Sequence, residues 1–456
     1  MKLLTTLSLQ KDSVFIQRGS KVHIEDVIFE LSGSIFQSNI IDLNFSCEDQ
    51  ELAEIMNHTP EHLTSIYKSF QANGEFSCKG NIKGLISKEN NPLLNMSCHI
   101  DKGNFILKSR PFILKNINLD GEITNGEDRN FQKTKIEITQ FDAETENGFI
   151  KGDFTIQNLN QYYLTADLIS SWDLAEISHY FEDSPFFNLQ GRVLANTQYS
   201  GHISFDGRFQ NYFLNAKHNS TTTFKNTSFK YKAFPLEFNV QSADCKFQNN
   251  TINVTNSFFT IADSDLSFNG DITDLIAYIL NKKDKINLTG DLSSTYIKFD
   301  ELLTLKDLSE NKSTSTMPHW INVNLNTNIT TFSYNTFIAS DITLQLAYKN
   351  LTLTAENMLL NSLNGNILGD FKFYESNNKL KLFSSINLKK LNIRNTFLAF
   401  DNFKQDFITA EHLKGVGTAE IQAQASWDSG FIFEQEELKV KSHLVIEKGE
   451  LIQFKP

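Results

Sequence analysis

The spacing closest to a catalytic centre is His58-Thr59-Pro60-Glu61-His62, which matches the H-x-x-E-H pattern of one group of zinc metalloproteases. Such a site needs both histidines on one face of a continuous helix. Pro60 fits only the first turn of a helix, with Thr59 as the N-cap, so His58 would lie outside that helix. We therefore interpret the segment as the start of a helix and expect no zinc site there.

Other patterns that could support chemistry are incomplete. Gly415-Val416-Gly417 begins like a dinucleotide-binding loop, but the third glycine is missing and strand-like sequence follows. The acid pairs Glu48-Asp49 and Glu436-Glu437 lie in polar stretches that are typical of a solvated surface. Walker A and G-x-S-x-G motifs do not occur. We predict no catalytic residues, no metal and no cofactor, and a protein that is not an enzyme.

Four cysteines, Cys47, Cys78, Cys98 and Cys245, are too few in 456 residues for a disulfide scaffold, and no C-x-x-C motif occurs. We interpret them as small buried or half-buried side chains on strands. Because the first three fall in one stretch, a single bridge among them stays open.

The elements that must position any site are strands. Apolar residues recur at every second position, as in 321–325 and 342–346, which predicts strands with one apolar and one polar face. The polar face carries mostly Asn, Thr, Ser, Lys and Asp, and antiparallel sheets tolerate one wet face. Dipeptides such as Asn125-Gly126 and Asn364-Gly365 indicate short turns or bulges between or within these strands.

Helical patterns are few and short. We expect helices near residues 51–56, 173–181, 275–280, 300–303 and 393–400. A polar segment without periodicity, 306–317, reads as a linker or exposed loop, which divides a body of 1–305 from a domain of 318–456.

The composition requires extensive burial. Phe occurs 39 times against 12 Tyr, while 42 basic and 54 acidic residues give a net charge of −12. This balance argues against nucleic-acid binding and against a polybasic membrane patch. At one strand per 8–12 residues the chain would hold on the order of 30 strands, whereas open sheets rarely pass about 10 strands. Either two sheets pack as sandwiches, or one sheet curls into a trough whose apolar interior needs a non-protein filling.

Several stretches resemble a known family. The run from Phe400 to Gly415 resembles the helix-exit and F-x-x-D…L-K-G stretch in the C-terminal domain of AsmA-like proteins of the Bacteroidetes type. Residues 419–425 and 444–451 are similar to strands of the same domain. Residues 76–84 and 268–275 resemble units of the family's β-rich body, so the resemblance covers most of the chain.

The resemblance implies a periplasmic protein built as a β-groove, related to TamB and to bridge-like lipid-transfer proteins, and held in the inner membrane by an N-terminal helix. This chain shows neither that anchor nor the family's last strands, so we expect an anchor upstream of it. The implied partners are a phospholipid or other acyl-chain lipid, the inner membrane and outer-membrane proteins. The implied role is lipid transport in outer-membrane biogenesis.

We therefore expect a mostly β fold: a long, twisted, mainly antiparallel sheet curled into an elongated groove, with a few short amphipathic helices. The candidate lining residues are the apolar residues on alternating positions, namely Leu119, Phe154, Ile156, Leu266, Phe268, Leu288, Leu344, Leu346, Phe371 and Phe373. Plain core packing is the competing interpretation for each of them. The alternative function is an assembly factor that engages outer-membrane proteins by strand addition. A glycan-binding adhesin is less favoured, because only 3 Trp and 12 Tyr are present.

Overall fold

The computed structural model describes residues 2–58, 70–107, 112–178, 184–204, 212–232, 234–303, 317–377, 379–428 and 432–453. The prediction of a mostly β fold with mainly antiparallel pairing and short helices is confirmed. The described residues form two compact units. The first comprises Met1–Ile177, Arg192–Thr222 and Phe247–Asn249, and the second comprises Ser178–Gly191, Thr223–Lys246 and Asn250–Pro456.

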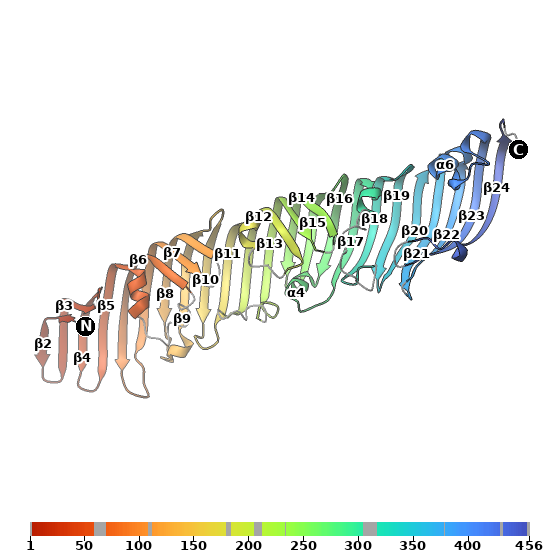
Figure 1. Cartoon of the computed structure of the whole chain (residues 1–456). Helices are drawn as coiled ribbons and strands as arrows, with labels where there is room; N and C mark the ends of the chain where they lie inside the picture. The colour runs from red at the N-terminus through yellow and green to blue at the C-terminus, as the bar shows by residue number, and fades with distance from the viewer. Residues whose placement is uncertain are drawn as a thin grey trace. The chain divides into compact units, whose positions relative to one another are not determined.

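The first unit is a meander in which each strand from β3 to β11 pairs antiparallel with the next (Figure 1). Its strands are β1 (Lys2–Leu4), β2 (Leu7–Gln10), β3 (Ser13–Ile24), β4 (Val27–Phe36), β5 (Ile40–Glu51), β6 (Phe70–Leu85), β7 (Leu93–Leu107), β8 (Phe112–Thr124), β9 (Lys135–Glu144), β10 (Phe149–Gln157) and β11 (Tyr163–Asp173). Three further strands, β12 (Phe186–His202), β13 (Lys217–Tyr231) and β14 (Phe234–Gln248), contribute residues to both units.

The second unit continues with antiparallel neighbours except at one place. Its strands are β15 (Thr251–Ile261), β16 (Ser264–Thr273), β17 (Ile286–Lys298), β18 (Ile321–Tyr334), β19 (Phe337–Lys349), β20 (Thr352–Ser362), β21 (Gly365–Ser376), β22 (Lys379–Asn392), β23 (Leu413–Trp427) and β24 (Lys439–Leu451). β17 and β18 run parallel, from Ile286 opposite Ile321 to Lys298 opposite Ser333. A parallel pair needs a long crossover connection, which residues 299–320 supply. Except for the buried Met317, the predicted linker 306–317 lies outside the described residues.

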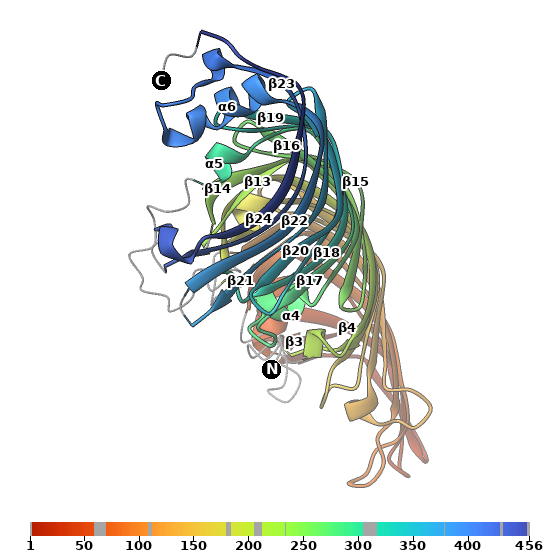
Figure 2. The same cartoon turned by 90° about the vertical axis from the view of Figure 1, so that its right-hand side faces the viewer.

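The predicted short helices are present where the structure describes them. They are α1 (Leu52–His58), α2 (Leu174–Ile177), α4 (Leu275–Ile279), α5 (Phe299–Leu303) and α6 (Ile393–Ala399). The last part of the predicted 173–181 helix, residues 179–181, lies outside the described residues, as does the helix start expected at Thr59. Within the second unit, Figure 2 shows bent strands with α5 and α6 on the hollow side of the sheet. This curvature is consistent with the predicted groove.

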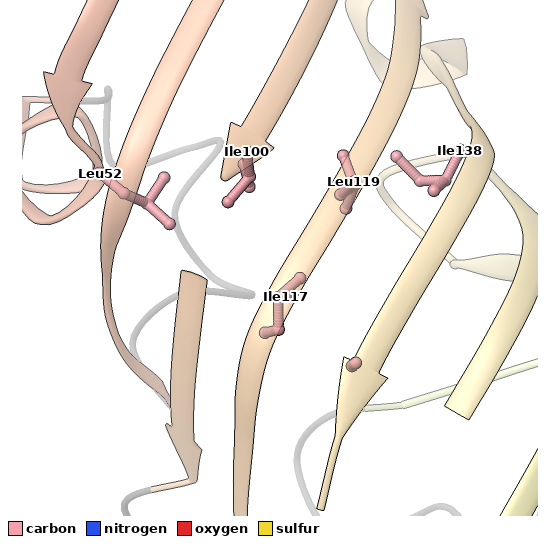
Figure 3. Close-up of a cluster of buried hydrophobic side chains, with 6 residues drawn as sticks. Leu52, Ile100, Ile117, Leu119 and Ile138 are labelled. Atoms are coloured by element: carbon pink, nitrogen blue, oxygen red, sulfur yellow. The ribbon is translucent and has the colours of Figure 1, made fainter. Parts of the chain in front are cut away.

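The apolar side of the first unit packs around α1. Leu52 from this helix joins Ile100, Ile117, Leu119, Ile138 and Ala143 in one buried cluster, five of which are labelled in Figure 3. Met56, one helical turn after Leu52, packs against the same cluster. The helix is therefore held by its apolar positions and covers part of the apolar side of the sheet.

Bulges reset the alternation of faces within single strands. In β20, Leu353 and Ala355 lie on the apolar side before the bulge, and Met358 and Leu360 lie on it afterwards. Asn357, with φ of 54°, supplies the left-handed residue at that point. The period of two therefore holds only between bulges, and a strand read straight through would assign half of its residues to the wrong face.

Candidate ligand-binding face

The three candidate lining residues of the first unit share one face. Phe154 and Ile156 are two positions apart on β10. Leu119 on β8 is opposite Phe141, which in turn is opposite Gly152, two positions before Phe154. Phe154 also packs against the buried cluster that contains Leu119. We call this side of the sheet the apolar face of the first unit.

The seven candidates of the second unit also share one face. Phe268 is opposite Leu292, and Leu266 and Leu288 have the same parity on those two strands. Leu346 is opposite both Leu325 and Ala355. Register then places Phe371 opposite Ala355 and Phe373 opposite Leu353, and Leu344 opposite Thr327. We call this side the apolar face of the second unit.

Within each unit the apolar side chains line up across the strands. One row of the first unit runs from β4 to β12 through Leu31, Phe45, Gly80, Met96, Ile123, Ile136, Ile156, Leu164 and Gly201. One row of the second unit runs from β15 to β23 through Ile252, Ile272, Leu288, Val323, Tyr348, Leu353, Phe373, Leu382 and Ala425. Each row therefore crosses nine strands and is made mostly of apolar residues.

These rows are only partly covered. In the first-unit row every residue is half-buried except Gly201, which is buried. In the second-unit row Ile252, Tyr348 and Ala425 are buried, and the other six residues are half-buried. Short helices cannot cover a sheet of this breadth, so apolar area stays accessible to a ligand.

The candidates differ in burial, and this separates core from accessible positions. Leu119 and Phe268 are 8% and 6% exposed, so they serve as core residues of their units. The remaining eight candidates are half-buried. Among these, Leu266 and Leu344 pack against the cluster of Ile297, Ile329 and neighbours.

Glycines on the apolar face make room for large side chains, a role that the sequence did not reveal. A Cβ on Gly80 would lie 2.4 Å from Cζ of Phe45, its partner across β5 and β6. A Cβ on Gly270 would lie 3.0 Å from Cζ of Phe268. Each ring therefore lies over a glycine, close to the backbone of the sheet.

The opposite face is polar and carries amide ladders. Asn322 donates to Asn287 at 2.8 Å, Asn326 donates to Asp291 at 3.0 Å, and Asn253 donates to Asp271 at 2.9 Å. Cross-strand pairs of this kind stabilise a sheet while they keep that face hydrated. The two faces of the second unit therefore differ in the way that the alternating sequence predicts.

Two hollows include candidate residues. One of about 760 Å³ in the first unit is lined by Phe154, Tyr199 and His218, among others. Sequence reasoning missed Tyr199 and His218, both of which are buried. Burial lowers the pKa of His218, so its ring is neutral at pH 7. The other hollow, of about 640 Å³ in the second unit, includes Phe371 but is lined mostly by residues of the opposite face, such as Lys372, Phe383 and Gln424.

The segments first considered for chemistry have structural roles. His58 ends α1, with its Nε2 3.5 Å from a carboxylate oxygen of Glu54 and 3.3 Å from one of Glu25. Glu61 and His62 lie outside the described residues. Among the residues that the structure describes, no group of three His, Cys, Asp or Glu side chains could hold a metal ion.

The remaining motifs are also part of the β framework. Gly415-Val416-Gly417 lies inside β23. Glu437 accepts a hydrogen bond from Lys379 at 2.7 Å, and Glu48-Asp49 lies exposed at the bulge of β5. All four cysteines are on strands, Cys47 and Cys78 buried and the other two half-buried, which confirms that interpretation.

The comparisons with known proteins identify no relative. No protein-family model, curated protein or solved structure matches this chain. Across the described ranges, none of the helices has the length and hydrophobicity needed to span a membrane.

Proposed function

We propose that this chain binds acyl-chain lipids, phospholipids above all, along the apolar face of each unit, without chemical conversion of the ligand. It would serve lipid transport between the inner and outer membranes of the periplasm and so contribute to outer-membrane biogenesis. The observation that carries the proposal is the half-buried apolar row that crosses nine strands in each unit. The periplasmic location and an inner-membrane anchor rest on the family resemblance described above.

The dimensions of a row suit an acyl chain. Neighbouring strands lie about 4.8 Å apart, so a row across nine strands is about 38 Å long. The hydrocarbon core of a bilayer is about 30 Å thick and holds two leaflets. One row is therefore longer than two acyl chains placed end to end.

The energetics also suit a carrier. Burial of a methylene group contributes about 0.8 kcal/mol, so ten methylenes on the face would contribute about 8 kcal/mol before the loss of chain entropy. A row of similar side chains offers nearly equal energy at each step along it. Lipids could then move along the row without a deep trap, while their headgroups stay in water.

The test compares two Phe→Asp substitutions on opposite faces of neighbouring strands. Phe371 is half-buried on the apolar face of β21, and Phe383 is 40% exposed on the polar face of β22. The register sets Lys372 opposite Phe383, so the two rings are close along the sheet but point to opposite sides. Phe371→Asp should lower the phospholipid that co-purifies with the chain several-fold, and Phe383→Asp should leave it unchanged.

Lipid is measured by mass spectrometry of organic extracts, and folding is checked by far-UV circular dichroism. Wild-type protein that purifies folded and free of phospholipid would overturn the proposal. Equal loss of lipid in both folded variants would show that the apolar face is not the binding surface.

A second candidate function, strand addition to outer-membrane proteins, is favoured by β24. All thirteen residues of this strand are exposed, including Val440, Leu444 and Ile446 on the apolar side. An exposed strand of this kind can template pairing with another chain. Lys441→Pro would block ladder formation on that strand. If this variant loses outer-membrane proteins from pull-downs while its lipid content is unchanged, strand addition is favoured over lipid transport.

A further inference from the structure

We propose that Cys47 and Cys78 form a disulfide that links β5 to β6 in the first unit. The two residues are directly opposite in the antiparallel register. Their Sγ atoms are 3.2 Å apart, and both side chains are buried. A disulfide requires about 2.05 Å between sulfurs and Cβ atoms about 3.5–4.5 Å apart, and directly opposed residues of neighbouring strands have Cβ atoms about 4.5–5.5 Å apart. Closing the remaining distance needs side-chain rotation and a small approach of the two strands.

The structure favours this pair over the third cysteine nearby. Cys98 on β7 is opposite Cys78, so it could compete for the same sulfur. However, its Sγ lies 3.5 Å from the position that a Cβ on Gly121 would occupy, which places it toward β8. Cys245 belongs to the second unit. The structure therefore assigns the bond to Cys47 and Cys78.

The electrostatics favour reaction at this pair. A hydrogen bond from Cys78 lowers the pKa of the Cys47 thiol, and the same contact raises the pKa of Cys78. Burial raises the pKa of Cys98 to about 11. The contact between the two sulfurs therefore favours a thiolate in this pair over one at Cys98.

The oxidant is a low-molecular-weight or protein disulfide, such as oxidised glutathione. One thiolate of the Cys47–Cys78 pair attacks one of its sulfurs, forms a mixed disulfide and releases one thiol. The other cysteine of the pair then loses its proton and displaces the second thiol. The Sγ–Sγ bond forms while two protons leave the cysteines and the oxidant's disulfide becomes two thiols.

The bond would stabilise the element that covers the apolar face. Residues 47 and 78 are 31 positions apart, and the loop between them contains α1. Leu52 and Met56 of α1 pack on the apolar cluster of the first unit. The bridge closes the base of this loop and so limits how far the helix can move from the sheet. This inference does not depend on the ligand of the apolar face.

The experiment is oxidative refolding of the full chain in a buffer of reduced and oxidised glutathione, followed by alkylation under denaturing conditions and peptide mapping. We expect two free thiols, at Cys98 and Cys245, and one linked pair of peptides that contains Cys47 and Cys78. Cys47→Ser should leave three free thiols, whereas Cys245→Ser should retain the bridge. Circular dichroism verifies that each sample has regained its β structure.

Four alkylated cysteines in chains with the wild-type circular dichroism spectrum would overturn the proposal. A bridge that includes Cys98 or Cys245 in the wild-type chain would also overturn it. Protease digestion of the folded protein supplies an independent readout, since the two fragments produced by cleavage within residues 48–77 should stay linked on a denaturing gel until a reductant is added.

Discussion

The close approach of β16 and β17 at two glycines predicts a strongly destabilising substitution. Gly270 and Gly290 are opposite in the register. A Cβ on Gly290 would lie 2.2 Å from the carbonyl oxygen of Asn269 and 2.6 Å from Cα of Gly270, whereas real Cβ atoms essentially never approach within 3.0 Å. In Gly290→Ala the two strands must therefore separate by about 0.8 Å at this point, the difference between 3.0 Å and 2.2 Å.

The cost follows from the ladder that this separation disrupts. Two adjacent backbone hydrogen bonds lengthened by about 0.8 Å are effectively lost, at about 1 kcal/mol each. The φ of +155° at this position is unfavourable for alanine and adds about 1 kcal/mol. The free energy of unfolding should fall by about 3 kcal/mol, which corresponds to a Tm lower by about 6–12 °C for a unit of this size. Thermal and urea denaturation followed by circular dichroism measure both quantities.

Gly417→Ala is the matched control on the apolar face of the same unit. Its new Cβ would be 3.6 Å from Cγ1 of Ile393 and 3.7 Å from Cδ1 of Leu444, which are ordinary contacts. The free energy of unfolding should change by less than about 0.5 kcal/mol. Equal stability of Gly290→Ala and wild type, or equal losses in both variants, would refute the argument from strand separation.

Two further substitutions test polar anchors. Asn125 is 1% exposed, accepts from the backbone N–H of Leu94 and donates to the carbonyl of Pro92, both at 2.8 Å. Asn125→Ala should therefore lower the free energy of unfolding by about 2–3 kcal/mol in urea titrations, and a change below about 0.5 kcal/mol would show that water replaces both contacts. Desolvation raises the pKa of Asp265, but hydrogen bonds from the Thr295 backbone and hydroxyl outweigh it and hold the pKa below its ordinary 3.8. The carboxylate thus contributes stability above about pH 4, and this contribution is lost as the pH falls through the folded-state pKa. Asp265→Asn should therefore be less stable than wild type by about 1 kcal/mol at pH 7 and by less at pH 3. A difference in the free energy of unfolding that is the same at both pH values would contradict this.

Local patterns were sufficient to predict the secondary structure and the two-faced strands. Segments such as 342–346 alternate apolar and polar residues, and an extended chain must then present two different faces. The helix at 393–400 was predictable for the same reason, since a short apolar pattern of helical period follows a strand. Bulges join two alternating stretches into one longer strand. β20, with eleven residues, joins two such stretches at Asn357.

The pairing between distant residues could not be predicted from the sequence. The parallel register of β17 with β18 joins residues 35 positions apart, across a segment that carries no pairing signal of its own. The opposition of Cys47 to Cys78 depends on where the bulge at Asp49 ends the register of β5 with β6. The orientation of Cys98 toward β8 depends on the pairing of β7 with Gly121. Such contacts arise from the packing of whole strands, and no spacing along the chain encodes them.

The sequence by itself determined that this protein is β-rich, that its strands have an apolar and a polar side, and that its Phe content requires extensive burial. Only the tertiary structure decided which candidates are core and which remain accessible, because that depends on what lies above each side chain. Leu119 and Phe268 are buried beneath neighbouring groups, while Phe371 and Phe373 on the same kind of strand stay half-buried. A period of two assigns a side chain to a face, whereas the covering of that face is a property of segments far away in the chain.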